Sequence, residues 1–219
     1  MRSRRRGGLA DEIVTHIRAQ VLGGEMRPGQ KVDQDAIAEA LDVSRSPIRE
    51  ALVVLGKEGL LDITPRRGAF VAKLTPADVI DHYELFGLVS GRVAAMAAES
   101  FTDDQMHELS AIHERFSSAQ RDEHSKLNEE FHRLINSAAP RRTRWLLRHL
   151  EQSIPAGFFG LTPGWGERAV SGHQAIVDAV AAREPEMARR AMDAHHHEAG
   201  VAAVRALEAR GFWEVASDD

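Results

Sequence analysis

The stretch Val43–Leu52, VSRSPIREAL, decides the fold of the first part of this chain. Its apolar residues recur at the spacing of one helix face. Arg45, Ser46 and Arg49 lie on another side, three and four residues apart, so they point the same way. Pro47 falls in the first turn, where its missing N–H breaks no intrahelical hydrogen bond. The stretch therefore predicts a short helix with one apolar and one cationic face.

A helix of this kind suits the major groove of DNA. Arginine can bind guanine through two hydrogen bonds, serine can bond a base edge or a phosphate, and the helix N-terminus adds positive potential. The alternative interpretation is an ordinary surface helix with scattered arginines. The neighbouring segments decide between the two.

Two helices are expected before this one. Apolar residues recur every four positions over residues 9–21 and predict a first helix. A turn at residues 26–30 and an N-cap at Asp33 introduce a second, shorter helix. Asp42 then occupies the tight turn before Val43–Leu52. This order of elements predicts a helix-turn-helix.

Two short β-type runs follow, at residues 60–64 and 69–73. Residues 65–68, PRRG, separate them. Because proline presets a turn dihedral and glycine supplies a positive φ, we expect a hairpin with two arginines at its tip. Such a tip would lie over a DNA backbone or reach a minor groove. With the preceding helices it predicts a winged helix-turn-helix over residues 9–74, and the alternative is a charged hairpin without a DNA-binding role.

Length and charge distribution fit this interpretation. The 219 residues are enough for two domains, and the net charge is −5. Residues 1–74 nevertheless carry +3 and the remainder −8, so only the first part is expected to meet DNA. Residues 1–8, MRSRRRGG, are expected to form a mobile basic arm, which either adds phosphate contacts or is only a solvated tail.

The composition also excludes some classes of protein. There is no cysteine, so disulfides and thiolate metal sites are excluded. No apolar run approaches the ~18 residues of a membrane span. We therefore expect a cytoplasmic protein that makes no use of a membrane.

Three segments together resemble the N-terminal domain of the GntR family of bacterial transcription regulators. They are residues 44–52 (SRSPIREAL), 58–61 (EGLL) and 66–71 (RRGAFV). The resemblance covers residues 9–74 and implies that the recognition helix and the wing contact operator DNA. The family usually has Gly in the helix-turn-helix turn, where Asp42 tolerates the left-handed geometry better than most residues.

The expected DNA-contacting residues combine the family's positions with the tip of the wing. The resemblance supplies two positions for arginine and one each for serine and glycine, and the tip adds a pair of arginines. The six residues are Arg45, Ser46, Arg49, Arg66, Arg67 and Gly68.

Residues 75–219 are expected to fold as an all-α bundle. Thr75 and Pro76 give a capped helix start, residues 102–105 a capping-box pattern, and Pro185 the start of a long last helix. Apolar residues keep a helical spacing between them, with a Gly- and Pro-rich break at 157–166. The predicted fold class is therefore mainly α, with a winged helix-turn-helix and its small hairpin followed by a helical bundle.

Three histidines lie on apolar faces of three different predicted helices: His132, His173 and His195. Buried imidazoles need partners, and one divalent metal can satisfy all three. Asn128, one turn before His132, offers a carbonyl oxygen as a fourth ligand. Three imidazoles favour zinc, nickel or another first-row metal over magnesium or calcium. The alternative is that each histidine bonds a backbone carbonyl in the core.

The sequence around these histidines resembles the FCD effector domain of the FadR subfamily. The matching motifs are residues 128–132 (NEEFH), 172–176 (GHQAI) and 191–195 (AMDAH). The subfamily commonly has Arg where Phe86 stands and Glu where Ser90 stands, so its polar effector contacts cannot be transferred. The resemblance implies a small carboxylate effector and a metal held by Asn128, His132, His173 and His195.

The expected function is that of a ligand-responsive transcription regulator, a repressor rather than an activator. It would bind a near-palindromic, double-stranded operator as a homodimer. An organic acid in the metal-floored pocket would change the spacing or mobility of the two winged domains.

Two alternatives stay open at this point. The first is a metal-dependent hydrolase with a fused DNA-binding domain, although the chain has no HExxH motif, no nucleophile elbow and no clearly placed carboxylate base. The second is an architectural DNA-binding protein whose helical half only dimerises.

Overall fold

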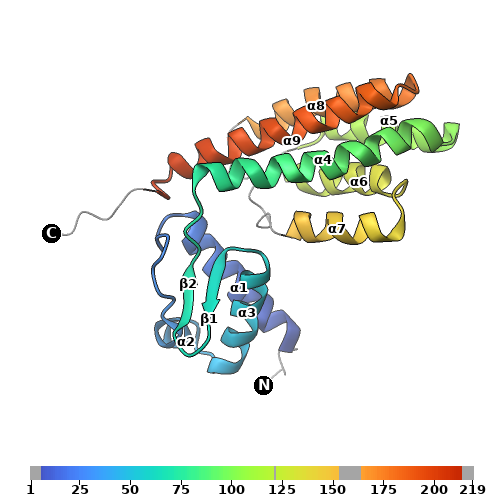
Figure 1. Cartoon of the computed structure of the whole chain (residues 1–219). Helices are drawn as coiled ribbons and strands as arrows, with labels where there is room; N and C mark the ends of the chain where they lie inside the picture. The colour runs from blue at the N-terminus through green and yellow to red at the C-terminus, as the bar shows by residue number, and fades with distance from the viewer. Residues whose placement is uncertain (1–5, 121, 153–163, 214–219) are drawn as a thin grey trace. The chain divides into compact units, whose positions relative to one another are not determined.

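The structure of the chain is a computed structural model that describes residues 6–120, 122–152 and 164–213. Its internal contacts divide the chain into two compact units (Figure 1). The first unit comprises Met1–Thr75, Gln152–Pro155 and Leu207–Asp219, and the second comprises Pro76–Glu151 and Ala156–Ala206.

The first unit has the predicted winged helix-turn-helix fold. Its elements are α1 (Arg6–Leu22), α2 (Gln34–Leu41), α3 (Arg45–Lys57), β1 (Leu61–Thr64) and β2 (Gly68–Val71). Helix α1 already includes residues 6–8 of the expected basic arm, and residues 1–5 lie outside the described part of the chain.

Local contacts explain the bounds of α2 and α3. The Asp33 side chain accepts hydrogen bonds from the backbone N–H groups of Asp35 and Ala36, at 3.0 and 3.1 Å, and so caps α2 as predicted. Asp42 ends α2 in the left-handed region, with φ 50° and ψ 52°. The tight turn therefore forms without glycine, and α3 can begin at Arg45.

The wing is an antiparallel pair in which Leu61 faces Val71 and Thr64 faces Gly68. Positive φ angles of 63° at Arg66 and 112° at Gly68 close the turn. A third segment pairs with this hairpin, because Lys31 forms an antiparallel bridge with Phe70. The sequence did not predict this pairing, which joins residues that are far apart in the chain.

The core of the first unit brings α1 and α3 together. Ile13, Ile17, Ile48 and Leu55 are fully buried between these elements and their neighbours. Beside them, a buried Arg18 guanidinium bonds both oxygens of Glu58, at 2.7 and 2.9 Å. A bidentate pair with little solvent contact fixes the start of the chain to the end of α3.

Residues 207–213 make their contacts within the first unit, although the sequence analysis placed them in the helical domain. Phe212 is only 1% exposed. The Trp213 indole N–H donates to the Leu74 carbonyl at 2.6 Å, and the Arg27 guanidinium donates to the Gly211 carbonyl. The first unit thus includes a buried aromatic side chain from the other end of the sequence.

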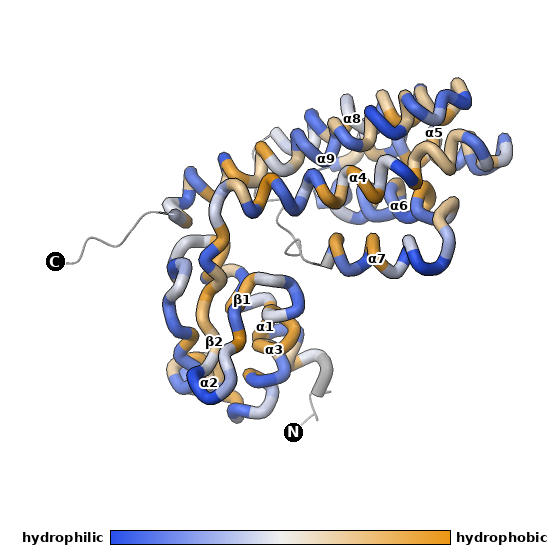
Figure 2. Tube along the Cα trace, in the orientation of Figure 1, coloured by the Kyte–Doolittle hydropathy of each residue, from blue (hydrophilic) through white to orange (hydrophobic). Residues whose placement is uncertain are grey.

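The second unit consists of helices in its described ranges, as predicted. They are α4 (Pro76–Ser100), α5 (Asp103–Ser118), α6 (His124–Asn136), α7 (Arg141–Gln152), α8 (Trp165–Ala181) and α9 (Pro185–Glu208), whose last two residues belong to the first unit. Figure 2 shows apolar and polar residues alternating along these helices, as amphipathic helices require. Most of the predicted break at 157–166 lies outside the described residues.

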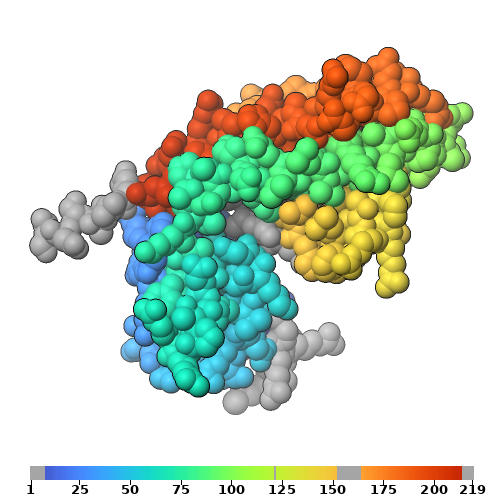
Figure 3. Space-filling view, viewed as in Figure 1, coloured from blue at the N-terminus to red at the C-terminus, as the bar shows by residue number. Residues whose placement is uncertain are grey.

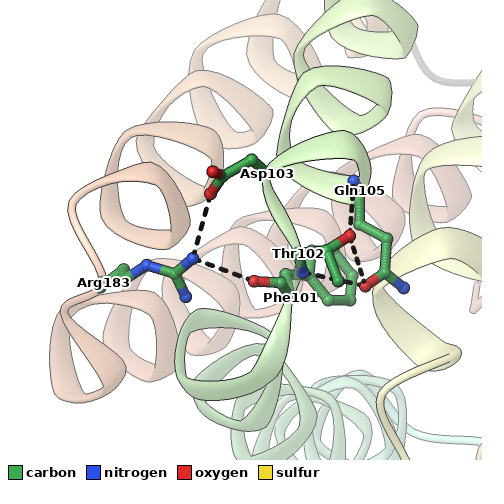
Figure 4. Close-up of polar contacts among 5 residues, drawn as sticks. All are labelled: Phe101, Thr102, Asp103, Gln105 and Arg183. Carbon is green, nitrogen blue, oxygen red and sulfur yellow. Dashed lines mark hydrogen bonds and ion pairs between the residues drawn. The ribbon is translucent and has the colours of Figure 1, made fainter.

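Capping residues fix the start of α5 (Figure 4). The Thr102 hydroxyl accepts from the Gln105 backbone N–H at 3.3 Å, and the Gln105 side chain accepts from the Thr102 N–H at 3.0 Å, which forms the predicted capping box. Arg183 donates to the Phe101 carbonyl at 3.1 Å and reaches Asp103 at 3.4 Å. These contacts tie the turn after α8 to the junction of α4 and α5.

Helices α4 and α9 run side by side in close contact (Figures 1 and 3). A Cβ atom at Gly87 would lie 3.3 Å from the His196 Cβ, and one at Gly200 would lie 2.9 Å from the Tyr83 Cβ. At Gly91 it would overlap the Asp193 carboxylate. Small residues on both helices therefore allow the backbones to approach, which brings the histidines of α9 toward α4. Among the described helices, none combines the length and the apolar composition needed to cross a membrane.

The burial of Phe212 predicts that residues 207–213 stabilise the first unit. Phe212→Ala should lower the free energy of unfolding of the first unit by about 3–5 kcal/mol, because it removes a fully buried ring. Urea denaturation with hydrogen exchange at the amides of α1 and β2 measures this. Val53→Ala, at a side chain that is 50% exposed, is the control and should change stability by less than about 0.5 kcal/mol. Equal effects of the two substitutions would contradict the assignment.

Candidate functional site

The N-terminal end of α3 presents the predicted polar face to solvent. Arg45, Ser46 and Arg49 are exposed, whereas Ile48 and Ala51 of the same helix are completely buried. The apolar stripe thus fixes the rotation of α3 in the unit and leaves both guanidinium groups outside. This arrangement provides the donors that major-groove recognition requires.

An acidic residue of α2 lies against this face. The Arg45 guanidinium is 2.6 Å from the Asp35 carboxylate, and both side chains are more than 60% exposed. An ion pair so open to solvent is weak. The pair therefore orients Arg45 while its guanidinium remains accessible from solvent.

Lys31 joins the α3 face to the wing, and sequence reasoning missed it. It lines a groove of about 410 Å³ together with Arg45 and Arg49. A Cβ at Gly68 would also lie 3.3 Å from the Lys31 Cε. The signal that could have identified Lys31 is its place in an extended segment just before Asp33, but its bridge with the wing is a long-range contact.

The wing carries the remaining predicted residues. Arg66 and Arg67 are exposed at the turn, and Gly68 is partly buried. The Arg67 guanidinium lies 5.9 Å from the centroid of the Phe70 ring. A cation beside an aromatic face is held in place while it remains accessible to phosphates.

The second unit brings His132, His173 and His195 together, as the sequence analysis expected. They come from α6, α8 and α9, and one ring nitrogen of each lies within 4.8 Å of one nitrogen of each of the others. The ring centroids are 5.3 Å apart for His132–His173, 5.3 Å for His132–His195 and 4.9 Å for His173–His195. Three nitrogens about 2.1 Å from one zinc ion lie roughly 3.4 Å apart, so small side-chain movements would complete such a centre.

The environment of these rings is apolar. His173 is 0% exposed and stacks on Phe131, with ring centroids 4.0 Å apart. Neither of its nitrogens has a hydrogen-bond partner within the described ranges. The alternative in which a backbone carbonyl satisfies this imidazole therefore does not hold for His173.

Burial keeps the three imidazoles unprotonated. Burial first, and then the neighbouring His195, lowers the pKa of His132 to about 3. Burial lowers the pKa of His195 to about 4. Burial and the adjacent histidines hold the pKa of His173 well below its usual range. The neutral imidazole is the form that binds a metal ion.

Asn128, the expected fourth ligand, lies one turn before His132 on α6 and is partly buried. Arg92 of α4 and Arg133 of α6 are exposed. The Glu130 carboxylate forms an ion pair with the Arg115 guanidinium at 3.3 Å. This pairing does not suit the role of a catalytic base.

Two more buried histidines surround the cluster, and the sequence analysis did not assign them to it. The ring of His113 lies 6.3 Å from that of His173, and its Nε2 is 2.9 Å from the Gln174 side-chain oxygen. His196 is 5% exposed, with its ring 5.7 Å from that of His132. The helical spacing of His113 with Leu109 could have revealed its burial, whereas His196 is buried only because α4 approaches so closely.

The lowered pKa values of the buried histidines predict that the folded protein becomes less stable as the pH is lowered. A histidine in the unfolded chain has a pKa of about 6.5. Below that pH the unfolded state binds protons that the folded state excludes, so the free energy of unfolding decreases as pH falls toward 4. Between pH 7 and pH 5 we expect the EDTA-treated protein to lose about 2 kcal/mol for each of His132 and His195.

Urea denaturation at several pH values tests this pH dependence. His195→Asn should flatten the slope, and His107→Asn, at an exposed position on α5, should leave it unchanged. A free energy of unfolding that is constant between pH 7 and pH 5 would contradict the burial of neutral imidazoles.

Comparison with known proteins gives two family matches. Residues 9–71 match the model of the bacterial regulatory proteins of the gntR family, and residues 81–198 match the FCD domain. An HTH-type transcriptional regulator of Mycobacterium tuberculosis (strain ATCC 25618 / H37Rv) is 32% identical over 184 residues, which are 83% of this chain and 75% of that relative. The HTH-type transcriptional repressor RspR of Escherichia coli (strain K12) is 26% identical over 85% of each chain.

A solved structure shares the fold. E. coli McbR/YncC superimposes with a TM-score of 0.61 at 19% identity, over 90% of this chain and 97% of that one. The relatives are named as transcriptional regulators, which decides against the hydrolase alternative. The chain therefore belongs to the gntR family of bacterial regulatory proteins, carries an FCD domain, and is a DNA-binding transcription regulator.

Proposed function

We propose that this regulator is a repressor whose FCD domain holds a divalent metal ion and responds to a small carboxylate effector. It acts as a homodimer on a near-palindromic operator, with one α3 helix in each half-site. Such a protein works in the cytoplasm, where the bacterial chromosome lies. The likeness to the E. coli repressor RspR supports repression rather than activation.

The observation that carries the metal proposal is the burial of His173 with both ring nitrogens unpartnered among the described residues. His132 and His195 each bring one nitrogen to the same place. Three neutral imidazoles suit zinc or nickel, and the Asn128 carbonyl oxygen is the proposed fourth ligand. A bound ion of this kind would act as a Lewis acid that receives the carboxylate of the effector.

The DNA proposal assigns separate roles to the helix and the wing. In it, α3 reads base edges in the major groove, while the wing tip contacts a backbone or a minor groove. The exposure of both arginines of α3 beside its buried apolar stripe supports this division. The proposed contacts are Arg45, Ser46, Arg49, Arg66, Arg67 and Gly68.

Effector and operator must influence each other to equal extents. If the effector binds one arrangement of the dimer more tightly, it shifts the population toward that arrangement and changes operator affinity by the same factor. An architectural DNA binder without an effector would show no such coupling.

Substitution of α3 tests the DNA assignment. Arg49→Ala should weaken binding to a selected operator by 10-fold or more, because one bidentate base contact contributes about 1–3 kcal/mol. Fluorescence anisotropy against specific and random duplexes measures the loss, and circular dichroism checks the fold. Arg92→Ala, an exposed arginine of the second unit, is the matched control and should bind normally. Unchanged specificity in Arg49→Ala would refute the role of α3.

Substitution of the histidines tests the metal site. His132→Ala, His173→Ala and His195→Ala should each reduce zinc or nickel uptake at least tenfold by calorimetry and elemental analysis, since each removes one ligand. His197→Ala is the control, because His197 is exposed and lies 3.3 Å from Glu84. Full metal uptake in all three variants would refute the site.

A further inference from the structure

The two exposed arginines of α3 differ in their surroundings. The Arg45 Nη2 lies 2.6 Å from the Oδ1 of Asp35, a residue of α2. Arg49 lies one turn later on α3 and forms no ion pair within the described ranges. Both arginines and Asp35 line the same groove of about 410 Å³. One guanidinium is therefore oriented by a carboxylate, and the other is not.

The start of α2 holds Asp35 firmly in place. The Asp35 backbone N–H donates to the Asp33 side chain at 3.0 Å, in the contact that caps the helix. The Asp35 carboxylate lies in the first turn, where the helix dipole favours an anion. Helices α2 and α3 also contact each other, and each buries an isoleucine, Ile37 or Ile48 (Figure 1). Asp35 is thus a fixed support for the long and flexible side chain of Arg45.

A guanidinium can bind a carboxylate and a base at the same time. It carries five N–H groups in one plane, and a bidentate contact with guanine uses two of them. The side chains of Arg45 and Asp35 are 63% and 68% exposed, so the ion pair is too weak to withhold Arg45 from a ligand. An arginine loses rotamer freedom when it binds, and a carboxylate that already restricts the side chain lowers this cost.

A carboxylate beside a DNA contact also has an unfavourable effect, because it repels the phosphates. This repulsion weakens binding to every sequence by a similar factor. Orientation of Arg45 strengthens binding only where a guanine stands at the matching position. The two effects of Asp35 can therefore be separated by comparing specific with random DNA.

We propose that Asp35 is a positioning residue for sequence recognition, whose carboxylate orients the Arg45 guanidinium toward a guanine of the operator. This inference rests on the proposed function, in which Arg45 contacts a base edge. It assigns different properties to the two arginines of α3. Recognition by Arg45 depends on Asp35, and recognition by Arg49 does not.

Asp35→Ala tests the role of the carboxylate. Fluorescence anisotropy at one salt concentration gives the specificity ratio, which is the Kd for random duplex divided by the Kd for an operator selected with the wild-type protein. This ratio should fall about two- to fivefold, the effect of one exposed ion pair. The loss of phosphate repulsion strengthens binding to both duplexes and cancels in the ratio.

Asp11→Ala is the matched control, because Asp11 is exposed on α1 and its loss removes the same charge. It should leave the specificity ratio unchanged, and circular dichroism checks that both variants fold. A ratio that stays constant or rises in Asp35→Ala would overturn the inference, since a rise would mean that the carboxylate withdraws Arg45 from DNA. An equal fall in Asp11→Ala would overturn it as well.

A double variant and a selection experiment assign the effect to Arg45. In the Arg45→Ala background, Asp35→Ala should cause no further fall in the specificity ratio, because no guanidinium remains to be oriented. Selection from random duplexes with Asp35→Ala should relax base preference at the operator positions that Arg45→Ala relaxes. It should preserve the positions that Arg49→Ala relaxes. A further fall in the double variant, or relaxation at the Arg49 positions, would overturn the inference.

Failure of the inference can be distinguished from failure of the proposed function. If Arg45→Ala leaves the specificity ratio unchanged, the proposed contact of Arg45 with the operator is wrong, and the inference is wrong with it. If Arg45→Ala lowers the ratio but Asp35→Ala does not, only the inference about Asp35 is wrong.

Discussion

The burial of His173 is the constraint on which the second unit depends. Its ring is enclosed and stacked on Phe131, and its two nitrogens have no hydrogen bond with any residue the structure describes. An imidazole in this position costs free energy unless something binds it. His132 and His195, which are partly exposed, each bring one ring nitrogen to the same place from two other helices. The helical bundle thus holds three neutral imidazoles close together, which are the ligands of the metal ion that we propose.

In the first unit, the packing of α3 keeps Arg45 and Arg49 at the surface and outside the core. Ile48 and Ala51 anchor one side of α3, and the left-handed Asp42 sets where the helix begins. The weak ion pair between Arg45 and Asp35 orients one guanidinium on the surface that we propose for DNA binding. In the function that we propose, the weakness of this ion pair matters, because a strong internal pair would compete with the operator for Arg45.

Much of this architecture could be predicted from the sequence because it depends on local signals. The Asp33 cap, the capping box at residues 102–105 and the spacing of apolar residues each act within a few positions. His132 and its two partners were found because histidine is unusual on an apolar helix face. These signals required no knowledge of which helices would meet.

The remaining features depend on contacts between distant residues. Lys31 joins the wing through a bridge to Phe70, and Phe212 enters the core of the first unit from the other end of the chain. His196 is buried because glycines let α4 and α9 approach. No periodicity in one segment reveals such pairings, so sequence reasoning gave the candidate ligands but not the His196 and Phe86 side chains that lie beside them.

The most direct test of the central claim is X-ray absorption spectroscopy of the purified protein at the zinc or nickel edge. Our account predicts one ion per chain with imidazole nitrogens from three histidines, at about 2.0–2.1 Å for zinc. A first shell made only of oxygen atoms, or protein that remains free of metal after exposure to both ions, would contradict it.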